Sequence, residues 1–195
     1  MRGFSLIELM IVVAVLALLL AFGMPALSTW AVDARIRSVA ESLQNGLRLA
    51  QSSALQRNRI GVFTLTEATP SWQATPSANG INWYVRTLPL AGSDEAGSTR
   101  ASDFYIEGNA VSSQSGISVS DGPAQLCFSP LGVQTTASGS YGSLDVSCSV
   151  RNPATYKVSS GVPGSRSMNV LVYPGGRVRM CDPSKPLSSE TPYGC

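Results

Sequence analysis

GFSLIELMIVVAVLALLLAFGMPAL, residues 3–27, is an apolar stretch that carries a single charged side chain, Glu8. From Leu9 to Leu27 it runs for 19 residues without a charge, and a helix of that length spans a hydrocarbon core of roughly 30 Å. A carboxylate at the start of such a run needs a cation or the membrane surface beside it, because burying it unpaired costs several kcal/mol. The stretch therefore predicts a membrane-spanning helix with an unusual acidic residue near its start.

The residues around that carboxylate form a recognisable pattern. Gly3, Phe4 and Glu8, followed by the apolar run, resemble the class III signal of type IV pilins and type II secretion pseudopilins. In that family a peptidase cuts after the glycine and the new N-terminal phenylalanine is methylated. The resemblance implies cleavage after Gly3, methylation of Phe4, and pairing of Glu8 with the Phe4 ammonium of a neighbouring subunit. It also implies three partners: the prepilin peptidase, other pilin or pseudopilin subunits, and inner-membrane lipid.

A helical period continues beyond the apolar run. Apolar residues recur at three- and four-residue spacing, with charged and polar residues on the other faces. These apolar positions are Ile36, Val39, Ala40, Leu43, Leu47, Ala50 and Ala54. We predict one helix from Phe4 to about Gln56, bent near Gly23–Pro25, whose second half packs on a sheet through this stripe.

Beyond Asn58 the chain changes to short strands joined by segments rich in Ser, Gly and Pro. The predicted strands are Ile60–Thr66, Asn82–Leu88, Phe104–Glu107, Gly116–Val119, Gln125–Ser129, Leu144–Cys148, Met168–Tyr173 and Arg177–Cys181, and the connections include Thr135–Gly142. The fold class is therefore α+β: a long N-terminal α-helix, its first half transmembrane, packed on a C-terminal antiparallel β-sheet domain, as the resemblance to pilins also implies. We divide the chain into a leader (1–3), a transmembrane and assembly half of the helix (4–29), and a globular domain (30–195).

Four cysteines, Cys127, Cys148, Cys181 and Cys195, lie outside the apolar run and form no C-x-x-C pair. An even number in a Ser- and Thr-rich domain indicates disulfides rather than a metal site. Three pairings are possible, of which we favour the nearest neighbours, Cys127–Cys148 and Cys181–Cys195. Disulfides need an oxidising compartment, so the globular domain is expected in the periplasm, with the chain anchored once in the inner membrane, or outside the cell when assembled in a pilus.

The composition excludes most catalytic classes. The chain has no histidine, which removes Ser-His-Asp and Cys-His catalysis and His-containing zinc sites, and it carries no nucleotide-binding or nucleophile-elbow motif. We expect no enzyme, no cofactor and no metal. The net charge of +2 is too small to indicate nucleic-acid binding, but residues 150–195 hold six basic side chains against two acidic ones.

Within that basic segment, Pro174-Gly175-Gly176 is a turn signal between two β-rich runs. The two-residue period of a strand places Arg177 and Arg179 on one face, about 7 Å apart, which matches successive phosphates along a nucleic-acid backbone. The simpler interpretation is that both arginines solvate an edge strand and discourage aggregation. Further cations that extend the patch in the first interpretation are Arg151, Lys157, Arg166 and Lys185.

Gly176-Arg177-Val178-Arg179 resembles the G-R-x-R motif near the C-terminus of the GspH/FimT group of minor pilins and pseudopilins. In FimT-like members this motif is associated with capture of double-stranded DNA during natural transformation, and it also occurs in FimU-like members that help to initiate pili. The leading hypothesis is a minor pilin that binds DNA through Gly176, Arg177 and Arg179 without reading its sequence. The alternative is a purely structural GspH- or FimU-like subunit that primes or tips a filament, and the sequence leaves open whether the machine is a type IV pilus or a type II secretion system.

Overall fold

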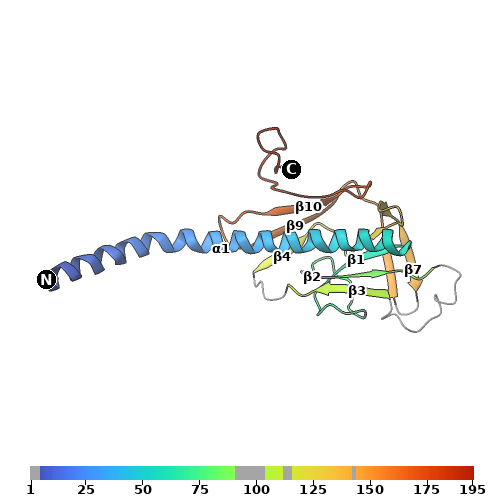
Figure 1. The fold of residues 1–195 in the computed structure, drawn as a ribbon, viewed down its shortest axis with the longest axis horizontal. Coiled ribbons are helices and arrows are strands. Elements are labelled where there is room, and N and C mark those ends of the chain that lie inside the picture. Colours follow the sequence, from blue (N-terminus) through green and yellow to red (C-terminus); the bar gives the residue numbers. More distant parts are fainter. Residues whose placement is uncertain (1–4, 91–103, 112–115, 142–143) are drawn as a thin grey trace.

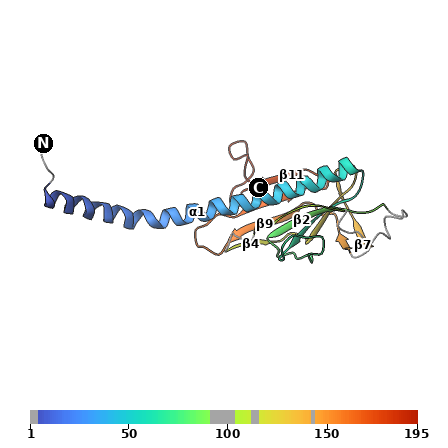
Figure 2. The same ribbon diagram turned by 60° about the horizontal axis from the view of Figure 1, so that its bottom comes forward.

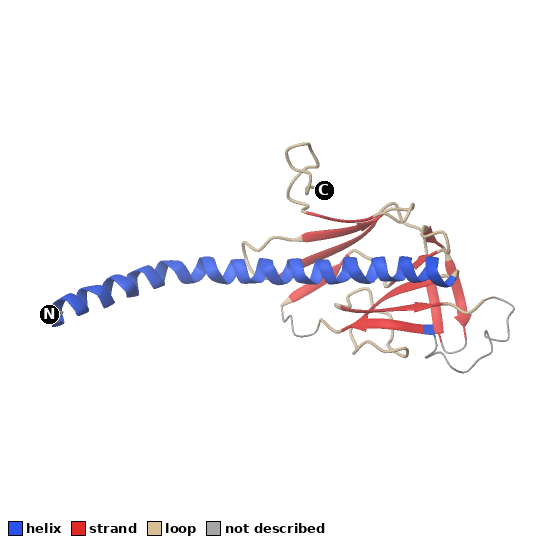
Figure 3. Ribbon diagram, viewed as in Figure 1, coloured by secondary structure: helices blue, strands red, loops and turns tan. Residues whose placement is uncertain are grey.

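The computed structural model describes residues 5–90, 104–111, 116–141 and 144–195, with the backbone alone for residues 20–27. A single long helix is followed by a series of short strands (Figures 1 and 3). The elements are α1 (Leu6–Arg57), β1 (Gly61–Thr66), β2 (Asn82–Thr87), β3 (Tyr105–Asn109), β4 (Ile117–Ser120), β5 (Gln125–Phe128), β6 (Gln134–Thr135), β7 (Ala137–Tyr141), β8 (Leu144–Cys148), β9 (Ala154–Ser160), β10 (Met168–Val172) and β11 (Val178–Cys181).

Helix α1 has 52 residues, so it is about 78 Å long at the rise of an ideal helix. It continues through Gly23–Pro25 as one element, and its N-terminal half curves and projects away from the strands (Figures 1 and 2). The helix ends at Asn58, whose φ of 51° places it in the left-handed region that often closes helices. The predicted helix is therefore confirmed to within one or two residues at each end.

Two antiparallel sheets pack against the C-terminal half of α1. The larger sheet has the order β3-β2-β1-β5-β6, and the second has the order β11-β10-β9-β4. Strands β7 and β8 form a separate two-stranded ribbon. Each of these strand pairs is antiparallel. The predicted α+β architecture is confirmed, with the strands divided among three sheets.

The main core lies between α1 and the two larger sheets. The predicted apolar stripe of the helix is at most 1% exposed, which confirms that it packs in the core. Phe63 stands at the centre, 6.0 Å from the Trp83 ring and 5.9 Å from the Tyr156 ring between centroids. Gly46 lets the two aromatic rings approach the helix, because a Cβ there would lie 2.7 Å from Trp83 and 2.9 Å from Phe63.

A smaller core lies between β1, β5 and the β7–β8 ribbon, and it surrounds the Cys127–Cys148 disulfide. Arg86 of β2 is only 3% exposed beside this core, and its guanidinium donates to the Asp145 carbonyl at 2.9 Å. Burial lowers the pKa of Arg86, because the charged form loses its hydration. The ribbon is thus fixed to the large sheet by a covalent bond and by a buried cation.

The predicted strands differ from the structure in one region of the chain. Eight strands were expected, and each corresponds to an observed strand with ends shifted by a residue or two. Strands β6, β7 and β9 were missed, and the expectation of an irregular connection over Thr135–Gly142 was wrong, since β7 runs through it. Strand β9 lies between β10 and β4, so one of the strands that the sequence analysis missed is an interior strand of its sheet.

Candidate functional site

The N-terminal half of α1 is the first candidate site. Its described large apolar side chains from Leu6 to Leu19 are between 51% and 78% exposed, and this half of the helix projects away from the strands (Figures 1 and 2). The Glu8 carboxylate has no salt-bridge partner among the residues that the structure describes. Gly3 and Phe4, the expected cleavage and methylation residues, lie outside the described part of the chain.

Within the described ranges no helix combines the length and the hydropathy that crossing a membrane requires. The transmembrane interpretation of residues 4–29 stays a prediction.

The hairpin between β10 and β11 is the second candidate site. A turn closes where the Gly176 N–H donates to the Tyr173 carbonyl at 2.9 Å, and the Tyr173 N–H donates to the Arg177 carbonyl at 3.0 Å. The Gln51 side-chain amide of α1 donates to the Gly176 carbonyl at 3.0 Å and to the Gly132 carbonyl at 2.7 Å. Gly176 has a φ of 84°, and a Cβ there would lie 1.9 Å from the Gly132 oxygen. The glycine of the motif therefore joins the hairpin to the end of the helix.

The two arginines of the hairpin have different surroundings. The Arg179 guanidinium donates to the carbonyls of Pro192 and Gly194, so it holds the C-terminal segment. Arg177 precedes β11, is exposed, and lies over the Tyr173 ring with its guanidinium carbon 5.2 Å from the ring centroid. The expectation that both residues belong to one strand was wrong, since β11 begins at Val178. Arg177 is the more exposed of the two, whereas Arg179 is half-buried and already donates to two carbonyls, so Arg177 is the better placed for a phosphate contact.

A disulfide and hydrogen bonds fix the segment that Arg179 holds. Disulfides join Cys127 to Cys148 and Cys181 to Cys195, the nearest-neighbour pairs favoured from the sequence, and no cysteine is free. The Asp182 carboxylate accepts hydrogen bonds from the Ser184 hydroxyl at 2.6 Å and from the Ser184 N–H at 2.9 Å. The hydroxyl bond is the main reason that the pKa of Asp182 lies below its usual value.

The four cations expected to extend the arginine patch lie in different places. Arg151 is near the hairpin, because its backbone N–H donates to the Gln134 side-chain oxygen, and the Gln134 backbone N–H donates to the Pro174 carbonyl. Lys157 lies in the middle of β9, opposite Asn169 of β10. Arg166 and Lys185 lie at the other end of β10, beside residues 30–37 of α1. The four residues therefore do not form one continuous patch with Arg177.

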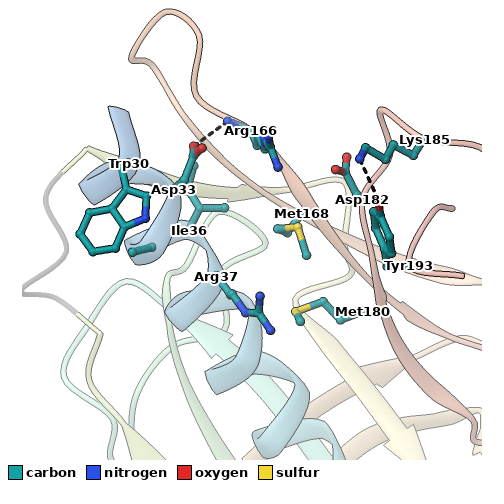
Figure 4. Close-up of a pocket in the computed structure, with 11 residues that line it drawn as sticks. Trp30, Asp33, Ile36, Arg37, Arg166, Met168, Met180, Asp182, Lys185 and Tyr193 are labelled. Carbon is teal, nitrogen blue, oxygen red and sulfur yellow. Dashed lines mark hydrogen bonds between the residues drawn. The ribbon is translucent and has the colours of Figure 1, made fainter. Parts of the chain in front are cut away.

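Arg166 and Lys185 instead line a groove that sequence reasoning missed. The groove has a volume of about 670 Å³ and lies between α1, the start of β10, the end of β11 and the C-terminal segment (Figure 4). Its lining comes from residues 30–37, 166–168 and 180–193, so no local sequence signal joins these positions. We call this end of the β-domain, beside Trp30–Arg37, the proximal end, and the end beside Gln51–Arg57 the distal end.

Within the described residues, no group of three or more His, Cys, Asp or Glu side chains is placed to hold a metal ion. The three candidate surfaces are an exposed apolar half-helix, a hairpin that is hydrogen-bonded to α1, and a groove lined by charged and apolar side chains. Such surfaces suit contacts with other macromolecules or with a membrane.

Comparison with known proteins gives three findings. Residues 1–24 match the prokaryotic N-terminal methylation motif, and residues 39–176 match the family described as type II transport protein GspH. Two crystal forms of the type IV minor pilin FimU from Pseudomonas aeruginosa are similar, each 15% identical over 78% of this chain. They are covered over 98% and 93% of their own chains, with TM-scores of 0.48 and 0.49. No curated protein matches significantly.

Proposed function

Because this chain belongs to the GspH family, and is thus a minor pilin or pseudopilin, we propose that it is cleaved after Gly3, anchored in the inner membrane by residues 4–29, and drawn into a filament through Glu8. Its globular domain, residues 30–195, then lies in the periplasm, or outside the cell if the filament is a pilus. The family match covers more than half of the chain, and the methylation motif covers the cleavage region.

The observation that carries this proposal is the contrast within α1. The apolar side chains of its N-terminal half are more than half exposed, so a lone subunit in water leaves a large apolar surface unburied. Glu8 lies in this surface without an ionic partner in the described chain. A membrane covers the apolar side chains before assembly, and the N-terminal ammonium of a neighbouring subunit neutralises Glu8 after it.

The proposal is tested with Glu8→Gln in the cell that makes the protein. We expect the variant to stay in the membrane fraction, because the amide is no harder to insert than the carboxylate. We expect its amount in sheared filaments to fall about tenfold or more, since the neighbour's ammonium then lacks its counter-charge. Immunoblots of the membrane and filament fractions measure both quantities.

Glu41→Gln is the matched control, because Glu41 is an exposed glutamate on the same helix that pairs with Arg37. It should enter filaments like the wild type. Normal incorporation of Glu8→Gln would contradict the assembly role of Glu8, and loss of the wild-type chain from the membrane fraction would contradict the anchor.

Contact with DNA is a second candidate function, and the exposed position of Arg177 favours it. Arg177 and Arg151 both lie at the distal end of the β-domain, far along α1 from its apolar N-terminal half. Arg179 is a poor probe of this function, because removing its guanidinium also releases the carbonyls of Pro192 and Gly194.

The test is binding of duplex DNA to the full chain in detergent micelles, over a salt series, for Arg151→Gln/Arg177→Gln against the wild type. Two phosphate contacts make the slope of log affinity against log salt about two units steeper in the wild type. Arg166→Gln, an exposed arginine at the proximal end, is the control and should leave the slope unchanged. Equal slopes for all three proteins would leave the purely structural role as the function of this subunit.

A further inference from the structure

The proximal groove lies directly beyond the end of the apolar run. Trp30 is three residues past Leu27 and is 71% exposed at the mouth of the groove. Figure 4 shows Trp30 and Arg37 on α1, with Arg166 and Lys185 on the loops across from the helix. If residues 4–29 cross the membrane, this groove lies at the level of the lipid headgroups, where exposed tryptophans are common.

We infer that the proximal groove binds the phosphate headgroup of an anionic phospholipid, through the cations of Arg166 and Lys185. This inference rests on the membrane anchor in the proposed function and adds the lipid class that the globular domain selects. Basic pockets beside a membrane segment are the usual binding sites for such headgroups.

The groove is lined by three cations and two carboxylates, and two of the cations, Arg166 and Lys185, have no salt-bridge partner among the described residues. Arg166 is exposed, and its guanidinium has no hydrogen-bond partner among the described residues. The Lys185 ammonium is held over the Tyr193 ring at 4.7 Å and donates to the Tyr193 hydroxyl at 2.9 Å, which fixes its position without neutralising it. Both cations lie near the Asp182 carboxylate and help to lower its pKa. A phosphate would add an acceptor for the N–H groups of the Arg166 guanidinium.

Three acidic side chains are close to these cations, and each already accepts hydrogen bonds from the protein. The Asp33 carboxylate accepts a hydrogen bond from the backbone N–H of Arg166 at 2.8 Å. The Asp182 carboxylate accepts hydrogen bonds from the backbone N–H and the hydroxyl of Ser184. Glu41 pairs with Arg37 at 2.9 Å, on an exposed part of the helix. These bonds order the rim of the groove and leave the guanidinium of Arg166 as its most available cation.

The apolar part of the groove fits the rest of the lipid. Ile36, Met168 and Met180 line it beneath the charged rim. Ile36 is 1% exposed and fixed in the core, whereas the two methionines are partly buried against it. Flexible methionine side chains adapt to irregular apolar groups such as a glycerol backbone and the first acyl carbons.

The test uses the full chain in phosphatidylcholine nanodiscs that contain a trace of spin-labelled lipid, either phosphatidylcholine or phosphatidylglycerol, labelled near the top of the acyl chain. Quenching of Trp30 fluorescence is measured, with Trp30→Phe as the blank for the other tryptophans. We expect phosphatidylglycerol to quench more strongly than phosphatidylcholine. Arg166→Gln/Lys185→Gln should reduce that preference about fivefold or more, because each cation near an anionic lipid surface contributes about 1 kcal/mol.

Two variants keep the test specific. Arg166→Lys retains the charge and should retain the preference. Arg151→Gln/Arg177→Gln removes two cations from the distal end and should leave the preference unchanged.

Equal quenching by the two lipids in the wild type would overturn the inference, as would loss of the preference in millimolar inorganic phosphate, which would indicate a site for the free anion. Failure of the wild type to enter nanodiscs of phosphatidylcholine alone would instead contradict the membrane anchor of the proposed function.

Discussion

The N-terminal half of α1 exposes the apolar side chains that the structure describes from Leu6 to Leu19, whereas the C-terminal half buries a complete apolar stripe from Ile36 to Ala54. Both halves are helical and rich in aliphatic residues. The first half is apolar on all its faces and the second on one face only. A helix that is apolar on every side needs lipid or other helices around it, while a helix with one apolar stripe needs a sheet. One helix therefore joins an N-terminal half that needs lipid or other subunits to bury its apolar side chains to a C-terminal half that buries them against the sheets of the same chain.

The largest expected effect tests this contrast directly. Leu47→Ala should destabilise the β-domain by about 2–5 kcal/mol, because Leu47 is fully buried and its loss leaves a cavity. Leu16→Ala, at a position 55% exposed, should change the free energy of unfolding by less than about 0.5 kcal/mol. Urea unfolding of the full chain in detergent, followed by tryptophan fluorescence, measures both. Similar losses in the two variants would break the distinction between the halves.

The next effect concerns a segment that is held by a covalent bond rather than by burial. Cys181→Ser/Cys195→Ser should cost about 3 kcal/mol, because the bond closes a loop of about 15 residues. The segment beyond β11 should also become sensitive to protease, while the core around α1 stays protected. Limited proteolysis with mass spectrometry identifies the cut sites, and cleavage within α1 at the same rate would contradict this separation.

A smaller effect is expected where the end of α1 meets the hairpin. Gly176→Ala should cost about 1–3 kcal/mol, since its φ of 84° strains an alanine and the new Cβ meets the Gly132 carbonyl. Gly175→Ala is the matched control next to it, because a Cβ there has nothing within 4 Å. Thermal unfolding of the two variants compares them, and equal midpoints would show that the helix does not constrain the hairpin.

The smallest effect depends on pH. The pKa of Asp182 is lower in the folded protein than its ordinary value of 3.8, chiefly because the Ser184 hydroxyl donates to the carboxylate. The folded state therefore gains stability from this group above that value, and the gain is lost as the pH falls below 3.8 through the folded pKa.

Asp182→Asn should flatten this acid dependence of the C-terminal segment, measured by amide exchange at low pH. Glu190→Gln, in the same segment and exposed, is the control. An unchanged acid dependence in Asp182→Asn would show that another group is responsible.

Strand β9 illustrates what sequence patterns leave hidden. Ala154, Tyr156 and Val158 are buried and alternate with Thr155, Lys157 and Ser159, so a period of two is present. The alternation was overlooked because the segment lies between Asn-Pro and Ser-Gly turn signals and carries three polar residues on its outer face. Strand β7 gave no such signal, since ASGSY becomes a strand only through its pairing with β8.

In the β10–β11 hairpin, too, the sequence predicts one feature and leaves another hidden. The hairpin was recognised from Pro174-Gly175-Gly176, because turn chemistry is local. The different surroundings of Arg177 and Arg179 could not be recognised from the sequence, because the carbonyls that Arg179 binds are 13 and 15 residues away in the chain. The period of a strand gives the face of a side chain, but not what covers that face.

Local patterns of residues predict the long helix, its apolar first half, the acidic residue within it, the α+β class and the resemblance to pilins, since each depends on residues that are close together in the chain. Four features come from the three-dimensional arrangement: the strands form three sheets, Gln51 is hydrogen-bonded to Gly176, Arg179 holds the C-terminal segment, and Arg166 and Lys185 line one groove with Trp30. Each of these depends on contacts between residues far apart in the chain, which local periodicity does not encode.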